Sequence, residues 1–108
     1  MVITEFFLSV GSLRTVELPE SVETIGNVAF RYCWSLKKII IPDGVKTIGN
    51  FAFDCCSHLE IVKLPDTLKT IGYGAFSECK SLKSITIPAG IENIKTGAFE
   101  KCKKLKTI

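Results

Sequence analysis

The sequence predicts a solenoid of short parallel β-strands, and three observations carry this prediction. Leucine recurs every 23 residues through the 108-residue chain, without insertion or deletion. Proline, an Ala-Phe pair and cysteine recur at the same period, while no window keeps the periodicity of a helix. Strict repetition at this length indicates stacked units, each of which covers the apolar face of the next. The columns include Leu13, Leu36, Leu59, Leu82 and Leu105; Pro19, Pro42, Pro65 and Pro88; and Cys33, Cys56, Cys79 and Cys102.

The front half of each repeat predicts a short strand. In the second repeat, Leu36, Ile39 and Ile41 alternate with residues that point the other way, as on a half-buried strand. Pro42 cannot donate a hydrogen bond to a ladder, so we expect it to end the strand. The Asp-Gly pair that follows predicts a turn.

The back half of each repeat returns apolar side chains to the core at irregular spacing. This spacing suits a second short strand or a 3₁₀ turn better than a long helix. About eight inward side chains per repeat gain no more free energy than the backbone loses in entropy, so a lone repeat cannot fold. In the second repeat these residues are Val45, Ile48, Ala52, Phe53 and Cys56.

The whole chain, residues 1–108, is expected to form one repeat domain. Four full repeats cover residues 13–35, 36–58, 59–81 and 82–104, and residues 105–108 begin a fifth. We expect residues 1–12 to form a degenerate back half. Neither end carries a polar capping segment, so the chain is either a piece of a longer array or a small protein whose open ends self-associate. The 23-residue shift places Val2 under Ile25, Phe7 under Phe30, Val10 under Cys33 and Ser12 under Ser35.

The repeats share one detailed pattern, L-x-x-I-x-I-P, then V/L-x-x-I-G, then A-F-x-x-C. One departure is Lys95, so we expect the turn in the fourth repeat to differ. The pattern resembles the BspA-like leucine-rich repeats. It is carried by Leu36, Ile39, Ile41-Pro42, Val45, Ile48-Gly49, Ala52-Phe53 and Cys56, and again by Leu59, Val62, Leu64-Pro65, Leu68, Ile71-Gly72, Ala75-Phe76 and Cys79; the column of Lys95 otherwise holds Gly26, Gly49 and Gly72.

This resemblance implies a right-handed leucine-rich-repeat solenoid with a parallel β-sheet on its concave side. Short strands or 3₁₀ turns would form the convex side, with little or no long helix. The resemblance also implies non-enzymatic binding by surface or secreted proteins that attach to host matrix proteins or other cells. The adhesive role rests on this analogy and not on the periodicity.

Charge is uneven along the chain, whose formal net charge is +3. Residues 1–54 hold five basic and six acidic side chains, and residues 55–108 hold nine and five. The lysines that crowd the C-terminal end have no interleaved aromatic residues in the sequence, so we expect a solvated flank and no nucleic-acid partner. No stretch is long and apolar enough to span a membrane, and the first residues do not resemble a signal peptide.

Five cysteines raise the question of disulfides, because stacked coils bring Cα atoms within bonding range. Four of them occupy one inward column, where a reduced thiol serves as a small core residue. Cys55 lies outside this column, and we expect an exposed thiol there that can react or form a dimer. The predicted buried column is Cys33, Cys56, Cys79 and Cys102.

The sequence indicates no catalytic, metal or cofactor site. The single histidine, His58, lies beside Cys55 and Cys56, but adjacent cysteines point to different sides and no second cluster completes four ligands. Paired carboxylates do not recur on one face, and no nucleophile has a plausible base beyond this histidine. The repeated glycines are expected to be turns and not a phosphate loop.

The candidate binding residues face outward from the front strands. Ile40 and Ile61 should lie diagonally within reach of each other, flanked by Lys38 and Lys63, as a small apolar centre with a basic rim. Exposed isoleucines on a strand can equally have no function. The face is predicted to hold Thr15, Glu17, Lys38, Ile40, Ile61, Lys63, Ser84 and Thr86.

Trp34 departs from its column, which otherwise holds serine and lysine. Tryptophan favours interfaces, but this side chain can also pack on the first half-repeat.

The sequence therefore predicts a protein-binding repeat module. The leading role is part of a cell-surface or secreted adhesin that binds host matrix or cell-surface proteins. An intracellular scaffold, compatible with reduced cysteines in the cytoplasm, and a purely structural spacer are the alternatives.

Overall fold

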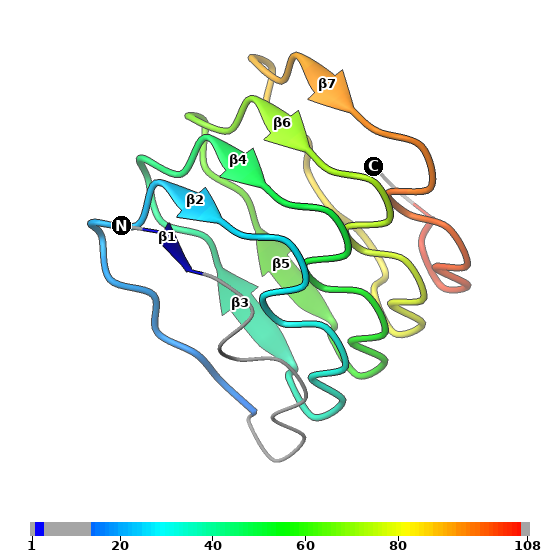
Figure 1. Cartoon of the computed structure of the whole chain (residues 1–108). Helices are drawn as coiled ribbons and strands as arrows, with labels where there is room; N and C mark the ends of the chain where they lie inside the picture. Colours follow the sequence, from blue (N-terminus) through cyan, green and yellow to red (C-terminus); the bar gives the residue numbers. More distant parts are fainter. Residues whose placement is uncertain (1, 4–13, 107–108) are drawn as a thin grey trace.

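The computed structural model describes residues 2–3 and 14–106, where the chain winds through successive coils stacked side by side. The coils follow one another in sequence order along the stack, from blue to red (Figure 1). The described residues contain short strands and turns and no helix. The strands are β1 (Val2–Ile3), β2 (Thr24–Ile25), β3 (Lys38–Ile40), β4 (Thr47–Ile48), β5 (Ile61–Lys63), β6 (Thr70–Ile71) and β7 (Asn93–Ile94).

The larger of the two sheets is formed by the back halves of the repeats. It has five parallel strands in the order β1-β2-β4-β6-β7, so each strand pairs with its equivalent in the next coil. Ile48 pairs with Ile25 on one side and Ile71 on the other, and all three side chains are fully buried. The expected second strand of the repeat is therefore present, and it forms the more continuous ladder.

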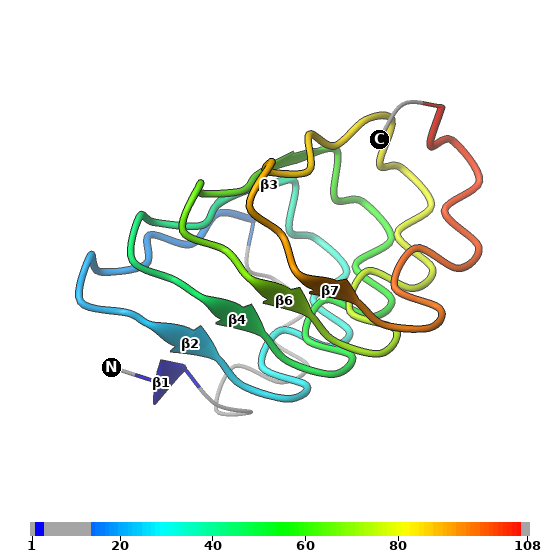
Figure 2. The same ribbon diagram turned by 90° about the horizontal axis from the view of Figure 1, so that it is seen from above.

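The front halves form the smaller sheet, on the other side of the coils (Figure 2). Strands β3 and β5 pair in parallel, and Thr15 extends this ladder through an isolated bridge to Lys38. The predicted alternation is confirmed, because Leu36, Ile39 and Ile41 are buried while Lys38 and Ile40 are exposed.

The corner after each back strand consists of β-turns. In the second coil, the amide groups of Ala52 and Asp54 donate within the coil to Gly49 and Phe51. The amide of Phe53, which lies between them, donates to Ala75 O of the next coil instead, at 2.7 Å. Because alternate amides leave the coil, the described corners consist of single turns closed by bonds from residue i to residue i−3, and not of a continuous 3₁₀ helix. The expected combination of short strands and tight turns is therefore present.

Phenylalanines stack through the centre of the coils. The rings of Phe30 and Phe53 are 5.2 Å apart, those of Phe53 and Phe76 are 5.1 Å apart, and those of Phe76 and Phe99 are 5.6 Å apart. The interplanar angles are 8°, 1° and 2°, so the rings are close to parallel. The first three rings are fully buried, and each supplies apolar area to both neighbouring coils.

An asparagine ladder explains the repeated glycine. Asn50 Oδ1 accepts a hydrogen bond from the amide of Tyr73 at 2.9 Å, and Asn27 Oδ1 accepts one from Asn50 at 2.8 Å. A Cβ atom on Gly72 would lie 2.6 Å from Asn50 Oδ1 and 2.7 Å from Asn50 N, closer than real contacts allow. The glycine is therefore required by close approach of the preceding coil.

The fourth repeat carries Lys95 in this glycine column, and its predecessor in the ladder is Tyr73 instead of asparagine. The amide of Lys95 still donates to Ile71 O at 2.9 Å, as the amide of Gly72 donates to Ile48 O at 2.8 Å. We expected the turn in the fourth repeat to differ, but this hydrogen bond to the preceding coil is unchanged. The Lys95 ammonium lies 5.9 Å from the Tyr73 ring centroid.

The pairing of β1 with β2 differs by one residue from the alignment predicted for the first residues. Ile3 pairs with Ile25 and Val2 with Thr24, whereas the 23-residue shift had placed Val2 under Ile25. The other residues used for that alignment, Phe7, Val10 and Ser12, lie outside the described residues.

Candidate binding face

The register of β3 and β5 gives the geometry of the candidate face. Lys38 lies opposite Ile61, and Ile40 lies opposite Lys63, so the two isoleucines are diagonal neighbours as predicted. Ile40 is 50% exposed and Ile61 is 52% exposed, whereas their strand neighbours Ile39 and Val62 are buried. We call the outward residues Thr15, Glu17, Lys38, Ile40, Ile61, Lys63, Ser84 and Thr86 the strand face.

A hollow of about 560 Å³ opens at the carboxyl ends of β3 and β5. Five predicted residues line it, and so do carboxylates that the prediction left out. The predicted lining residues are Thr15, Glu17, Lys38, Ile40 and Lys63; the added acidic ones are Glu20, Asp43 and Asp66.

The remaining strand-face residues lie apart from this hollow. Ile61 and Ser84 line neither hollow of this face, although both are exposed. Thr86 lines a smaller hollow of about 310 Å³, together with Lys63, Asp66 and Pro88. The predicted set is therefore divided between two adjacent depressions, with Lys63 shared by both.

The rim of the strand face is mixed in charge and not simply basic. Acidic residues follow three of the four repeat prolines, at Glu20, Asp43 and Asp66, and Ala89 takes this place in the fourth. This periodic signal was visible in the sequence and would have identified the acidic side of the hollow. A partner of complementary charge must therefore present both signs, with basic groups near the prolines and acidic groups near the lysines.

The predicted cysteine column forms a ladder of thiols. Cys56 Sγ donates to Phe30 O at 3.2 Å, Cys79 Sγ to Phe53 O at 3.2 Å, and Cys102 Sγ to Phe76 O at 3.0 Å. Cys33 is buried as well, whereas Cys102 is only half-buried. Burial raises the pKa of the Cys56, Cys79 and Cys102 thiols, so these side chains remain protonated donors at neutral pH.

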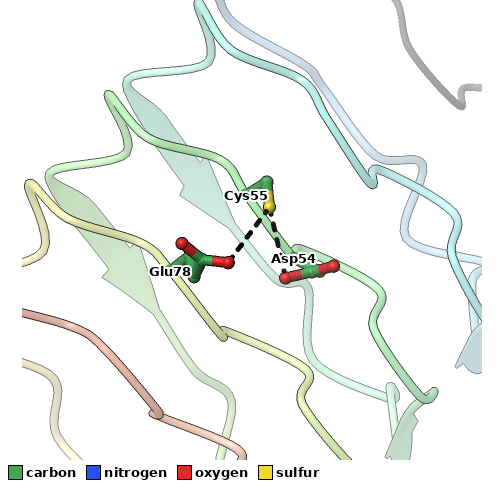
Figure 3. A group of neighbouring side chains, drawn as sticks. All are labelled: Asp54, Cys55 and Glu78. Atoms are coloured by element: carbon green, nitrogen blue, oxygen red, sulfur yellow. Dashed lines mark hydrogen bonds between the residues drawn. The ribbon is translucent and has the colours of Figure 1, made fainter.

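Cys55 is less accessible than the expected exposed thiol. It is half-buried, and its Sγ lies 3.5 Å from Asp54 Oδ1 and 4.0 Å from Glu78 Oε2 (Figure 3). Burial and these carboxylates raise the pKa of Cys55 to about 11. Because the thiolate is the reactive form, this thiol is a poor nucleophile at neutral pH.

Asp54, Cys55 and Glu78 form the one potential metal-ligand group found among the described residues, with ligand atoms within 4.8 Å of one another. A cation already contacts this group, because Arg31 Nε donates to Asp54 Oδ2 at 2.9 Å. The Asp54 side chain is only 7% exposed, so the guanidinium balances its buried charge. His58 faces elsewhere, with Nδ1 2.7 Å from Trp34 O, and so the residues weighed from the sequence as metal ligands do not converge.

The stacked coils and their parallel ladders define a leucine-rich-repeat protein. A family model described as the BspA type leucine rich repeat region matches residues 2–108 in six copies. The chain belongs to this family, and the predicted family and fold class are confirmed.

Solved structures with the same fold include two informative neighbours. A leucine-rich repeat protein of T. pallidum is 38% identical with a TM-score of 0.93, over 97% of this chain and 49% of that one. A leucine-rich cell surface protein of Faecalibacterium prausnitzii is 34% identical with a TM-score of 0.82, over 86% of this chain and 24% of that one. The chain thus spans about half and about a quarter of these proteins. No curated protein matches the chain.

Within the described ranges, no helix has the length and apolar character needed to cross a bilayer.

Proposed function

We propose that this chain is a non-enzymatic protein-binding module of a cell-surface or secreted adhesin, and that the strand face contacts its ligand. The observation that carries the proposal is the pair of exposed isoleucines, Ile40 and Ile61, placed diagonally among charged side chains beside a hollow. An apolar centre that loses water inside a polar rim is typical of protein-binding hot spots. The cell surface protein of F. prausnitzii supports the location.

The ligand class that we propose is a host matrix protein or a protein on another cell, in keeping with the family resemblance. The charges at the hollow favour a segment that presents both basic and acidic groups. Lys38 and Lys63 would meet its acidic groups, while Asp43 and Asp66 would meet its basic ones.

Binding of the monomeric chain to immobilised matrix and plasma proteins, in reducing buffer at physiological salt, tests this proposal. The Ile40→Thr/Ile61→Thr variant should fold normally and bind at least tenfold more weakly, because it removes apolar area from the centre. Tyr73→Ser is the matched control, since Tyr73 is 49% exposed but follows β6 of the other sheet. Equal affinity of the double variant and the wild-type chain would exclude the strand face.

The alternative functions make different predictions in the same assay. An intracellular scaffold or a structural spacer would bind none of the extracellular proteins. A scaffold would still bind a cytoplasmic partner through the strand face, whereas a spacer would bind no protein there.

A second proposal is self-association through the C-terminal end of the stack. The amides of Gly74, Phe76 and Glu78 donate to the next coil, whereas no described residue accepts from the equivalent amides of residues 97, 99 and 101. These amides follow β7 in sequence, and the Ile94 side chain of that strand is 44% exposed. Sedimentation velocity over a range of concentrations should show a dimer, and Ile94→Lys should weaken it; a strict monomer at all concentrations would exclude it.

A further inference from the structure

The corners of successive coils form one continuous edge of the stack, which we call the corner edge. It consists of residues 31–35, 54–58, 77–81 and 100–104, which follow one another along one side of the molecule (Figure 1). Amide hydrogen bonds hold the corners in register: Tyr32 to Asp54 at 2.9 Å, Cys55 to Ser77 at 2.8 Å and Glu78 to Glu100 at 2.7 Å. This edge is distinct from the strand face.

The first corner is aromatic. Trp34 is 47% exposed, and its ring centroid lies 5.2 Å from that of Tyr32. The guanidinium of Arg31 lies over the Tyr32 ring, 4.9 Å from its centroid. Because Arg31 is also paired with Asp54, its charge is largely balanced, and the Trp34 ring remains the open surface of this corner.

Lysines occupy the same edge further along the stack. Lys80 and Lys103 stand two and three coils beyond Trp34 in its own column, and Lys101 and Lys104 flank Lys103. All four are exposed, and the acidic side chains on this edge that remain outside the Arg31 pair are Glu78 and Glu100. Folding thus aligns the C-terminal lysines with an exposed tryptophan that is distant from them in sequence.

Side-chain hydrogen bonds stiffen the edge between its two ends. His58 Nδ1 lies 2.7 Å from Trp34 O, and Ser81 Oγ donates to Ser57 O at 2.7 Å. Each bond joins one coil to the next at the exposed corner. Such pre-organisation lowers the entropy lost when a ligand is bound along several coils.

We propose that the corner edge binds a sulfated polysaccharide, with a sugar ring stacked on Trp34 and sulfate groups at Lys80, Lys101 and Lys103. Three coils separate Trp34 from Lys103, or roughly 15 Å at about 4.8 Å per coil, which a few linked sugars can span. The lysine ammonium groups act as compact point charges toward sulfate oxygens.

The same features disfavour two other polyanions, a single-stranded nucleic acid and an acidic peptide. A single-stranded nucleic acid stacks successive bases on successive aromatic rings, but the exposed corner aromatics are confined to the first coil. An acidic peptide offers no extended apolar ring face to Trp34. Binding of either one is an outcome of the experiment.

Heparin immobilised on a sensor surface is the probe, with the whole chain as analyte at physiological salt. We expect saturable binding that weakens about fivefold or more in Trp34→Ala and in Lys101→Gln/Lys103→Gln. Lys46→Gln/Lys69→Gln is the matched control, because it removes the same charge beside β4 and β6 and should leave affinity unchanged. Urea unfolding of each variant establishes that the fold is retained.

Several results would overturn the proposal. These are no binding to heparin, unchanged affinity of Trp34→Ala, or an equal loss in the matched control. Equal or tighter binding of poly-glutamate or of a single-stranded oligonucleotide in competition would also overturn it. The Ile40→Thr/Ile61→Thr variant should retain heparin binding, so failure of the strand-face proposal and failure of this one are distinguishable.

Discussion

The central coils and the last coil contain the same repeat, yet the same columns have different environments in the two regions. Ile48 and Phe53 are fully buried. Their equivalents in the last coil are more accessible: Ile94 is 44% exposed, and Phe99 is half-buried. The difference arises because a central side chain is covered on two sides, and a side chain of the last coil is covered on one side only. The stability of this fold therefore comes more from the contacts between neighbouring coils than from the contacts within a single repeat.

The largest expected effect comes from removing a central ring. Phe53→Ala should lower the free energy of unfolding by about 3–5 kcal/mol, because it leaves a cavity between two stacked rings. Phe99→Ala should cost less than half as much, since among the described residues Phe99 stacks on Phe76 alone, and it is partly exposed. Urea denaturation measures the free energy of unfolding that each variant loses. Equal losses in the two variants would contradict the comparison between central and last coils.

The glycine column should show the next largest difference. Gly72→Ala should destabilise by about 1–3 kcal/mol, because its Cβ would overlap Asn50. Lys95→Ala, at the same place in the last coil, should change stability by less than about 0.5 kcal/mol. Thermal unfolding of the two variants provides the test; a harmless Gly72→Ala would show that the coils separate easily at this ladder.

Alkaline pH should weaken the central coils. The folded-state pKa values of Cys56 and Cys79 are raised by burial, so their stabilising contribution is complete below the unfolded pKa, about 8.5, and is lost as pH rises above it. The slope is about 1.4 kcal/mol per pH unit for each thiol. Urea unfolding between pH 7 and 10.5 measures it.

The matched variants for this pH series are Cys56→Ala/Cys79→Ala and Cys102→Ala. The double variant should flatten the alkaline loss, whereas the single variant in the half-buried last position should change it less. A double variant with the wild-type pH dependence would assign the loss to other groups.

The smallest of these effects concerns the acidic residues of the corner column. Asp54→Ala should cost about 1 kcal/mol by leaving the partly exposed Arg31 without its carboxylate, a modest value because solvent screens this pair. Glu100→Ala, in the same column of the last coil, should have no measurable effect, since Glu100 is exposed. Denaturation at low and high salt would separate the charge contribution from packing.

Sequence periodicity predicted the inward columns and the diagonal placement of Ile40 and Ile61, because period-two alternation fixes which side chains share a face. It did not predict that the back strands form the larger sheet. Strands of two residues, such as Thr47–Ile48, are too short to show alternation.

The errors of prediction have local physical causes. Residues 1–12 lack proline and cysteine landmarks, and the alignment of Val2 was wrong by one residue. The environment of Cys55 depends on Asp54 and on Glu78 of the next coil, in columns where residue type changes from repeat to repeat. The binding role of the strand face remains a prediction, since exposure and shape do not specify a ligand.

The parallel stack of phenylalanines has a consequence for how such a chain can change its length in evolution. Each 23-residue unit adds one ring about 5 Å further along, and every column then continues in step. Duplication or loss of a whole unit leaves all later contacts intact. Insertion of a single residue between two inward columns would displace the ring, thiol or strand partner of that coil, so variation in length is confined to whole units or to exposed turns.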